Sequence, residues 1–212
     1  MHITDKYMKI IKILFILSLT TLFAQDVDSS SKWSQESINL QKQAMQMSFD
    51  NVFETGSKRI KVIDSALVLL DRSYKIDTTY YHALTSQIGL YQEKKDYELA
   101  LTTMKEVLKL KPDFAEVEFG LGMQYDFLKH KEDAKRHYLK ALDLYKERLN
   151  QKKYSDINNH FHIGLCLVLL GKEKEGKEYI YKFNGNQEMD EFIEMFDVKN
   201  LTRSSLLKSF YK

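Results

Sequence analysis

Apolar side chains recur every three or four residues along most of this chain, which is the spacing of amphipathic helices. Short polar segments separate these stretches, such as the charged turn at 93–96 and the Asn-Gly-Asn turn at 184–186. The pattern predicts helices over about 34–54, 58–75, 80–93, 97–110, 114–128, 157–170 and 172–183, with a further helix through Ala134 and Ala141. Two short amphipathic helices are expected beyond residue 186.

Turn-forming residues predict where several of these helices begin and end. Ser34 and Asp96 stand where an N-cap side chain would accept a hydrogen bond from the first helical turn. Gly56 is expected to end the first helix in the left-handed conformation that glycine favours. Pro112 is expected in the first turn of the next helical pair, where its missing N–H costs nothing.

Residues of one kind recur at a constant interval of 34 positions. Ala66, Ala100 and Ala134 are separated by 100−66 and 134−100, and Tyr91 and Tyr125 by 125−91. A small residue at a fixed place in each pair lets two helices approach closely, while the aromatic residues fill the space toward the next pair. The interval therefore predicts stacked repeats, each consisting of two helices.

The interval lengthens once, in the second half of the chain. Gly122 and Gly164 look equivalent but are 42 residues apart, which is 34 plus 8. The extra residues fall in 148–156, either as two more helical turns or as a longer loop. After them, Gly176 takes the place of the repeated alanine, and Ile180 takes the bulky position four residues later.

This arrangement of Ala, Tyr and the chain's one proline, Pro112, resembles the tetratricopeptide repeat. The resemblance covers about residues 58–183 and is strongest over 81–148. It implies an all-α fold of antiparallel helix-turn-helix repeats, stacked into a short right-handed solenoid with a C-terminal helical cap. We accordingly expect a repeat domain over 34–186 and capping helices over 187–212.

Residues 1–24 have the pattern of a secretory signal peptide. Three lysines precede the apolar run 13–23, and Ala24 comes before a polar segment. The run is shorter than the ~20 residues needed to cross a bilayer. Leu22 stands where a small residue is preferred, so an uncleaved membrane anchor is the alternative. Residues 25–33 are expected to form a flexible linker, and the protein to reach the periplasm or cell envelope of a bacterium.

Charge excludes one class of partner. Without residues 1–24 the chain has 32−3 = 29 basic and 30−1 = 29 acidic side chains, so it carries no formal net charge. A nucleic-acid-binding protein needs clustered Lys and Arg to neutralise phosphates, and no such block is present. We therefore expect no nucleic-acid partner, and membrane contact only through an uncleaved N-terminus.

No pattern for metal binding or catalysis stands out. His160 and His162 are two residues apart and would point to different faces of a helix, while His130 and His137 lie two turns apart. Cys166 lies in an apolar helical run, where a thiol is inert, and no motif of a known catalytic site is present. We expect no metal, no cofactor and no enzyme activity, and an enzyme with an unrecognised site is the most distant alternative.

The resemblance also implies where a partner would bind. In tetratricopeptide proteins the first helices of successive repeats line a concave surface that holds a peptide. The basic and amide residues that some members use to hold a terminal carboxylate are absent here. What remains is an apolar strip that would suit an amphipathic helix, formed by Phe119, Met123, Phe127, Phe161 and Leu165.

Two other interpretations of this apolar strip stay open: ordinary core between repeats, or a surface covered by the protein's own tail. The expected function is a non-catalytic interaction scaffold of the cell envelope that binds a protein or peptide. The alternative is a membrane-tethered structural component of an envelope assembly.

Overall fold

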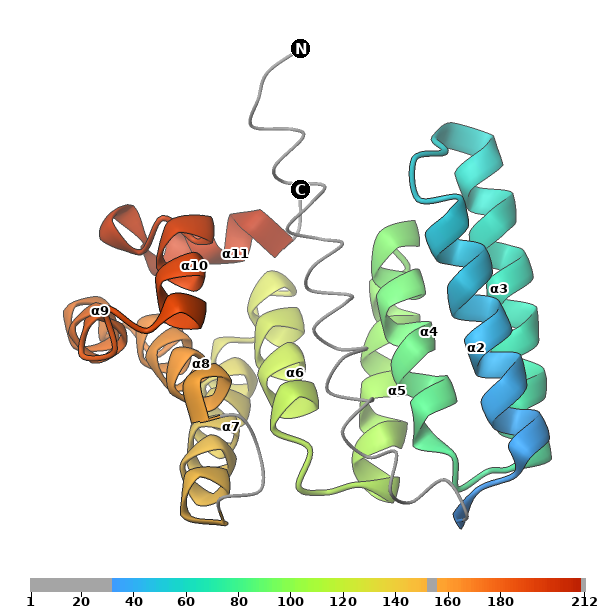
Figure 1. Ribbon diagram of the computed structural model, residues 1–212, viewed down its shortest axis with the longest axis horizontal. Helices are drawn as coiled ribbons and strands as arrows, with labels where there is room; N and C mark the ends of the chain where they lie inside the picture. The colour runs from blue at the N-terminus through green and yellow to red at the C-terminus, as the bar shows by residue number, and fades with distance from the viewer. Residues whose placement is uncertain (1–31, 152–155, 211–212) are drawn as a thin grey trace. The chain divides into compact units, whose positions relative to one another are not determined.

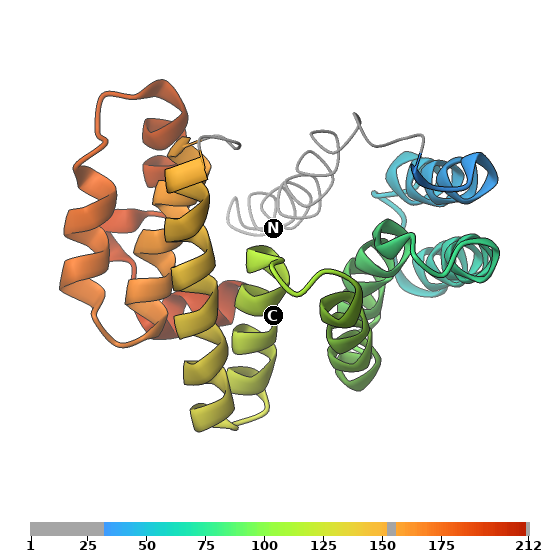
Figure 2. The ribbon, with the colours of Figure 1, turned by 90° about the horizontal axis from the view of Figure 1, so that it is seen from below.

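A computed structural model of the chain describes residues 32–151 and 156–210, and the expected signal peptide lies outside these ranges (Figure 1). All regular structure within them is helical, and consecutive helices pack in neighbouring pairs (Figures 1 and 2). The all-α fold class is therefore confirmed. The chain divides after Pro112 into two compact units, whereas a single repeat domain had been expected over 34–186.

The first unit contains four helices that pack in sequence order. They are α2 (Gln35–Asp50), α3 (Gly56–Ile76), α4 (Tyr81–Lys94) and α5 (Tyr97–Leu110). Ala66 of α3 is fully buried beside Ile63 and Leu70. Ala100 of α5 is also fully buried, so two residues of the 34-residue interval lie in the packed interior of this unit.

The second unit continues the pairing and ends in the tail. Its elements are α6 (Ala115–Phe127), α7 (Lys131–Gln151), α8 (Asp156–Leu169), α9 (Glu173–Tyr181), α10 (Gln187–Met195), the short 3-10 helix η2 (Val198–Asn200) and α11 (Arg203–Phe210). Helix α6 packs on α7, α7 on α8 and α8 on α9. Helix α10 then packs on α8 and α9, and α11 on α8, so both tail helices rest on the last pair.

Glycines bring the paired helices of the second unit together. A Cβ atom at Gly122 of α6 would collide with the ring of Tyr138 on α7, and one at Gly164 of α8 with Ile180 on α9. A Cβ atom at Gly176 would lie 2.6 Å from the carbonyl oxygen of Gly164. Tyr138 and Ile180 both occupy the bulky position of their repeat. They are 180−138 = 42 residues apart, as are Gly122 and Gly164, so the two contacts are equivalent.

Three turns between paired helices have the same backbone structure. Lys95, Lys129 and Gly171 adopt φ values of 65°, 68° and 83°, in the left-handed region. In each turn the next residue's N–H bonds back to a carbonyl five residues earlier: Asp96 to Tyr91, His130 to Tyr125 and Lys172 to Leu167. Lys95 and Lys129 are 129−95 = 34 residues apart, so the turns follow the repeat, although only one of them uses glycine.

The predicted helix ends were partly right. Ser34 is the N-cap of α2, and its hydroxyl accepts a hydrogen bond from Ser37 N at 3.5 Å. Gly56 has the expected left-handed backbone (φ 58°), but it begins α3 instead of ending α2, which stops at Asp50. The turn at 51–55 therefore belongs to neither helix.

Two other predicted helix starts need correction. Asp96 occupies the N-cap position of α5, but its side chain makes no capping hydrogen bond and lies 3.6 Å from Lys94 Nζ instead. Pro112 lies in the turn before α6, because that helix begins at Ala115 after the N-cap residue Phe114.

The extra eight residues extend a helix. Helix α7 has 21 residues where α5 has 14, and it continues to Gln151. Of the two alternatives, additional helical turns are therefore confirmed, and residues 152–155 lie outside the described ranges.

Trp33 belongs to the folded first unit and not to the linker in which the sequence placed it. Its indole ring makes edge contacts with Tyr80 at 5.4 Å and His82 at 5.0 Å between ring centroids. The next residue, Ser34, donates its backbone N–H to Asp77 Oδ2 at 2.9 Å. These contacts connect the start of α2 to α4 and to the turn before it.

Candidate functional site

The predicted apolar strip lies on α6 and α8 of the second unit. Phe119, Met123, Phe161 and Leu165 are each 1–2% exposed and belong to one core cluster, whereas Phe127 at the end of α6 is half-buried and is not part of that cluster. The structure thus brings four of the five residues together but does not leave them open to solvent.

Phe119 lies among side chains of α7 and α8. Its ring centroid is 6.2 Å from that of Tyr138 and 5.7 Å from that of His162, the latter in an edge-to-face arrangement. Aromatic pairs prefer edge-to-face arrangements of this kind. For Phe119, the interpretation as core between helical pairs therefore describes the observed packing.

Phe161 is covered by the tail. Its ring stacks on that of Phe192 from α10 at 4.7 Å between centroids, with an angle of 24° between the planes, and lies 5.0 Å from the ring of Phe196. Figure 1 shows α10 in red-orange against α8. For Phe161, the interpretation as a surface covered by the tail describes the observed packing.

Arg203 holds the second tail helix in place. Its guanidinium group pairs with Asp126 of α6, and its Nε donates to the carbonyl oxygen of Leu169 at 2.8 Å. Its backbone N–H donates to Glu173 Oε1, also at 2.8 Å. Arg203 therefore connects α11 to three other helices. Sequence reasoning missed it, because a charged residue in an amphipathic tail has the pattern of a solvent-facing one.

A buried carboxylate lies between α6 and α7. Glu118 is 1% exposed and lies 2.6 Å from His137 Nδ1 and 2.5 Å from Lys140 Nζ. Burial raises the pKa of Glu118, but the hydrogen bonds and charges of His137 and Lys140 outweigh it, so the net pKa is lowered. The group is therefore ionised and paired at neutral pH.

A second buried ion pair joins α6 to the extended end of α7. Arg148 donates to both oxygens of Glu116, at 2.5 and 2.9 Å. Tyr145 stacks on His162 at 5.0 Å, and burial raises its pKa well above the ordinary value. Burial also lowers the pKa of His162, whose Nδ1 donates to the carbonyl oxygen of Asn158. His162 is therefore neutral at pH 7.

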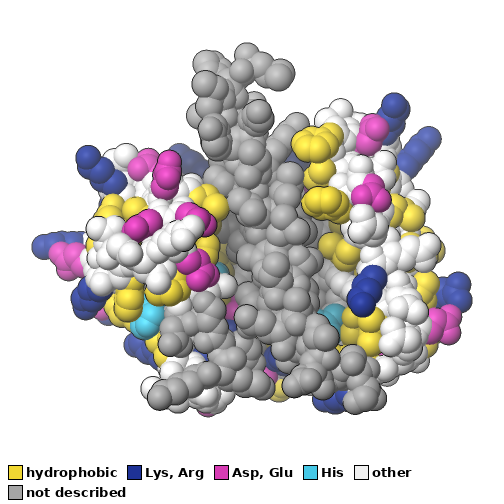
Figure 3. All heavy atoms as spheres, in the orientation of Figure 1, with side chains coloured by type: hydrophobic (Ala, Val, Ile, Leu, Met, Phe, Trp, Pro, Cys, Tyr) yellow, Lys and Arg dark blue, Asp and Glu magenta, His cyan; other side chains and the backbone are white. Residues whose placement is uncertain are grey.

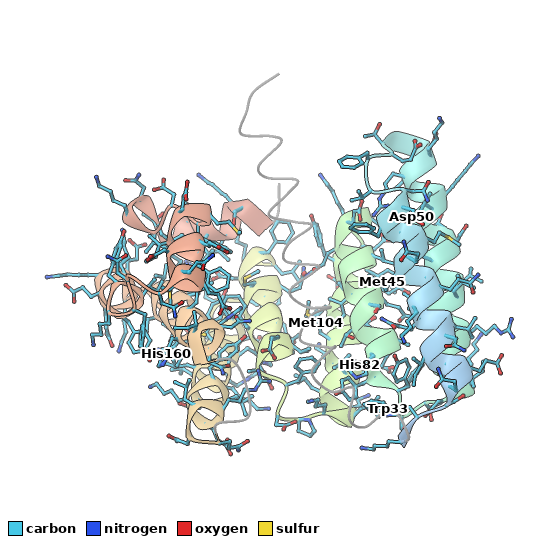
Figure 4. All side chains as sticks on the ribbon, in the orientation of Figure 1. Trp33, Met45, Asp50, His82, Met104 and His160 are labelled. Atoms are coloured by element: carbon cyan, nitrogen blue, oxygen red, sulfur yellow. The ribbon has the colours of Figure 1, made fainter. Side chains whose placement is uncertain are left out.

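The two neighbouring histidines of α8 point to different partners, as predicted. His160, labelled in Figure 4, stacks on Phe183 at 3.9 Å and lies 2.8 Å from Tyr179 Oη, whereas His162 packs against Phe119 and Tyr145. Within residues 32–151 and 156–210, no group of three or more His, Cys, Asp or Glu side chains is arranged to hold a metal ion. Cys166 is fully buried, and burial raises the pKa of its thiol.

Exposed apolar side chains lie at the turn that joins α2 to α3. Phe49 near the end of α2 is 55% exposed, and Phe53 in the following turn is 88% exposed. Figure 3 shows apolar side chains in yellow at this upper end of the first unit.

Among the helices that the structure describes, none combines the length and apolar character needed to cross a membrane.

A family model of the tetratricopeptide repeat matches residues 89–114, which run from the second half of α4 through α5. This stretch contains Tyr91, Ala100 and Pro112, three of the residues on which the resemblance was based. A comparison with curated proteins gives no match. Tetratricopeptide repeats are generally non-catalytic interaction scaffolds.

Solved structures with similar architecture extend this likeness over most of the chain. Pseudomonas aeruginosa PilF is 19% identical, with a TM-score of 0.50 over 84% of this chain and 76% of that one. PilW, described as a widely conserved type IV pilus biogenesis factor, is 15% identical, with a TM-score of 0.51 over 84% of this chain and 77% of that one. At these identities the likeness concerns the fold alone. In fold, the chain resembles tetratricopeptide-repeat proteins.

Proposed function

We propose that this protein is a non-catalytic interaction scaffold of the bacterial cell envelope, and that the apolar face of α8 binds an amphipathic helix of a partner protein. One observation supports this most strongly: an amphipathic helix already lies on that face, with Phe192 of α10 stacked on Phe161. A helix laid into an apolar groove is a recurring way in which proteins recognise segments of their partners.

The N-terminal sequence supports the envelope location. A basic segment followed by a short apolar run and Ala24 is the pattern of an exported protein. The first alternative, a membrane-tethered structural component, requires that this segment remain attached. The exported scaffold and the tethered component predict different masses for the native protein, because only the tethered component keeps the N-terminal segment.

Affinity purification of the tagged full-length chain from the envelope of its native host tests both parts. We expect a specific protein partner to copurify, and the intact mass of the purified chain to correspond to a start near Gln25. A mass that retains residues 8–24 would favour the tethered component. Absence of any copurifying protein after chemical cross-linking would contradict the scaffold function.

A further inference from the structure

We infer that α10 is an internal ligand of the α8 face, and that it must leave before a partner helix with a similar apolar face can bind. This inference deepens the proposed function and rests on it, because it names the kind of partner and the way its access is controlled. The expected partner segment is a helix with two aromatic residues four positions apart, matching Phe192 and Phe196.

The apolar face of α10 shows what the site accepts. Met189, Phe192 and Ile193 of α10 and the C-cap residue Phe196 fall at helical spacing, so they lie on one side of this segment. This side meets the core cluster of the second unit. The opposite side carries Glu188, Glu191 and Glu194, all exposed. The site therefore recognises the apolar side and leaves the other face of its ligand free.

Burial at this contact is unequal. Met189 of α10 is 0% exposed and Phe161 of α8 is 2% exposed, whereas Phe192, Ile193 and Phe196 each keep part of their surface in solvent. Since apolar stabilisation is roughly proportional to the area removed from water, these three side chains contribute less to docking than fully buried ones would. Segments with less apolar burial open at lower free energy than the rest of a domain.

The tail begins after a glycine in the left-handed region and has a polar anchor in its second helix. Gly185, exposed and with φ 93°, precedes α10, and Asn186 caps that helix by accepting from Met189 N at 3.2 Å. In α11, Arg203 pairs with Asp126, whose carboxylate also accepts from Tyr138 Oη at 3.2 Å. Loss of the Arg203 pair would therefore weaken the docking of the tail, while Asp126 keeps one partner.

Closure by the tail lowers the apparent affinity for any competitor. If α10 is docked in about 99% of molecules, a competing helix binds about 100-fold more weakly than to an open chain. Variants that weaken tail docking should recover this affinity without any change in the binding face itself.

A labelled synthetic peptide spanning residues 186–210 serves as the probe, and fluorescence anisotropy measures its binding to full-length chains. The test variant is Phe192→Ser with Phe196→Ser, which alters only the tail. We expect it to bind the peptide at least about tenfold more tightly than the wild-type chain does. A peptide carrying the same two serine substitutions should bind neither chain.

A second pair of variants tests the polar anchor. Arg203→Glu should also increase peptide binding, whereas Lys208→Glu makes the same change of charge at an exposed position of α11 and should not. If Arg203→Glu fails to fold, the serine variant decides alone. Equal binding of the peptide to wild-type and serine-variant chains, or binding to neither, would overturn the inference. The scaffold function would then still depend on whether a partner copurifies.

Discussion

At the scale of single residues, buried charges hold helix pairs together in places that apolar periodicity does not indicate. Glu118, Glu116 and Asp126 all lie on α6, and each pairs with a basic side chain of another helix. In the sequence these acids are indistinguishable from solvent-facing ones, because their partners are 19 or more residues away. Their pairing depends on tertiary structure that spacing alone does not fix.

Glu118 gives a prediction about pH. Its pKa in the folded protein lies below the ordinary value of 4.5, so its contribution to stability is present above that value and is lost as pH falls through the folded pKa. We expect Glu118→Gln to lower the melting temperature at pH 7, and the difference from wild type to shrink below about pH 4.5. Asp143→Asn, exposed on α7, is the matched control. A difference that stays constant from pH 7 to pH 3 would contradict the pairing.

At the scale of elements, the repeat interval predicted helix pairs and their close contacts, but not all of their ends. Gly122 and Gly164 meet Tyr138 and Ile180 as the 42-residue spacing implies. The left-handed residues Lys95 and Lys129 could not be anticipated, because lysine carries no turn preference. Their positions are set by helix packing and by the backbone hydrogen bonds of the turn.

Gly122→Ala tests this packing. Alanine favours a helix by about 1 kcal/mol over glycine, but overpacking typically costs about 1–3 kcal/mol. The Tyr138 ring is 1% exposed and its hydroxyl donates to Asp126, so it has little room to move. We expect chemical denaturation to show a net loss of stability. In a Tyr138→Leu background the same change should be neutral or stabilising, and an equal loss in both backgrounds would contradict the proposed contact.

At the scale of the whole molecule, the sequence identified the architecture and left the availability of the apolar strip open. Helical periodicity makes Phe119 and Phe161 look alike, since both lie on apolar faces of first helices. Their neighbours differ: Phe119 meets Tyr138 and His162 within the array, and Phe161 meets Phe192 of the tail. Which residues are core and which form a covered surface depends on how the tail docks.

Competitive elution of the copurified partner tests the central claim most directly. The partner is bound to immobilised full-length chain, and the peptide of residues 186–210 is added at increasing concentration. If a partner helix and α10 share the α8 face, the peptide should release the partner, and the version with Phe192→Ser and Phe196→Ser should not. Retention of the partner at peptide concentrations that saturate the open chain, or equal release by both peptides, would contradict the account.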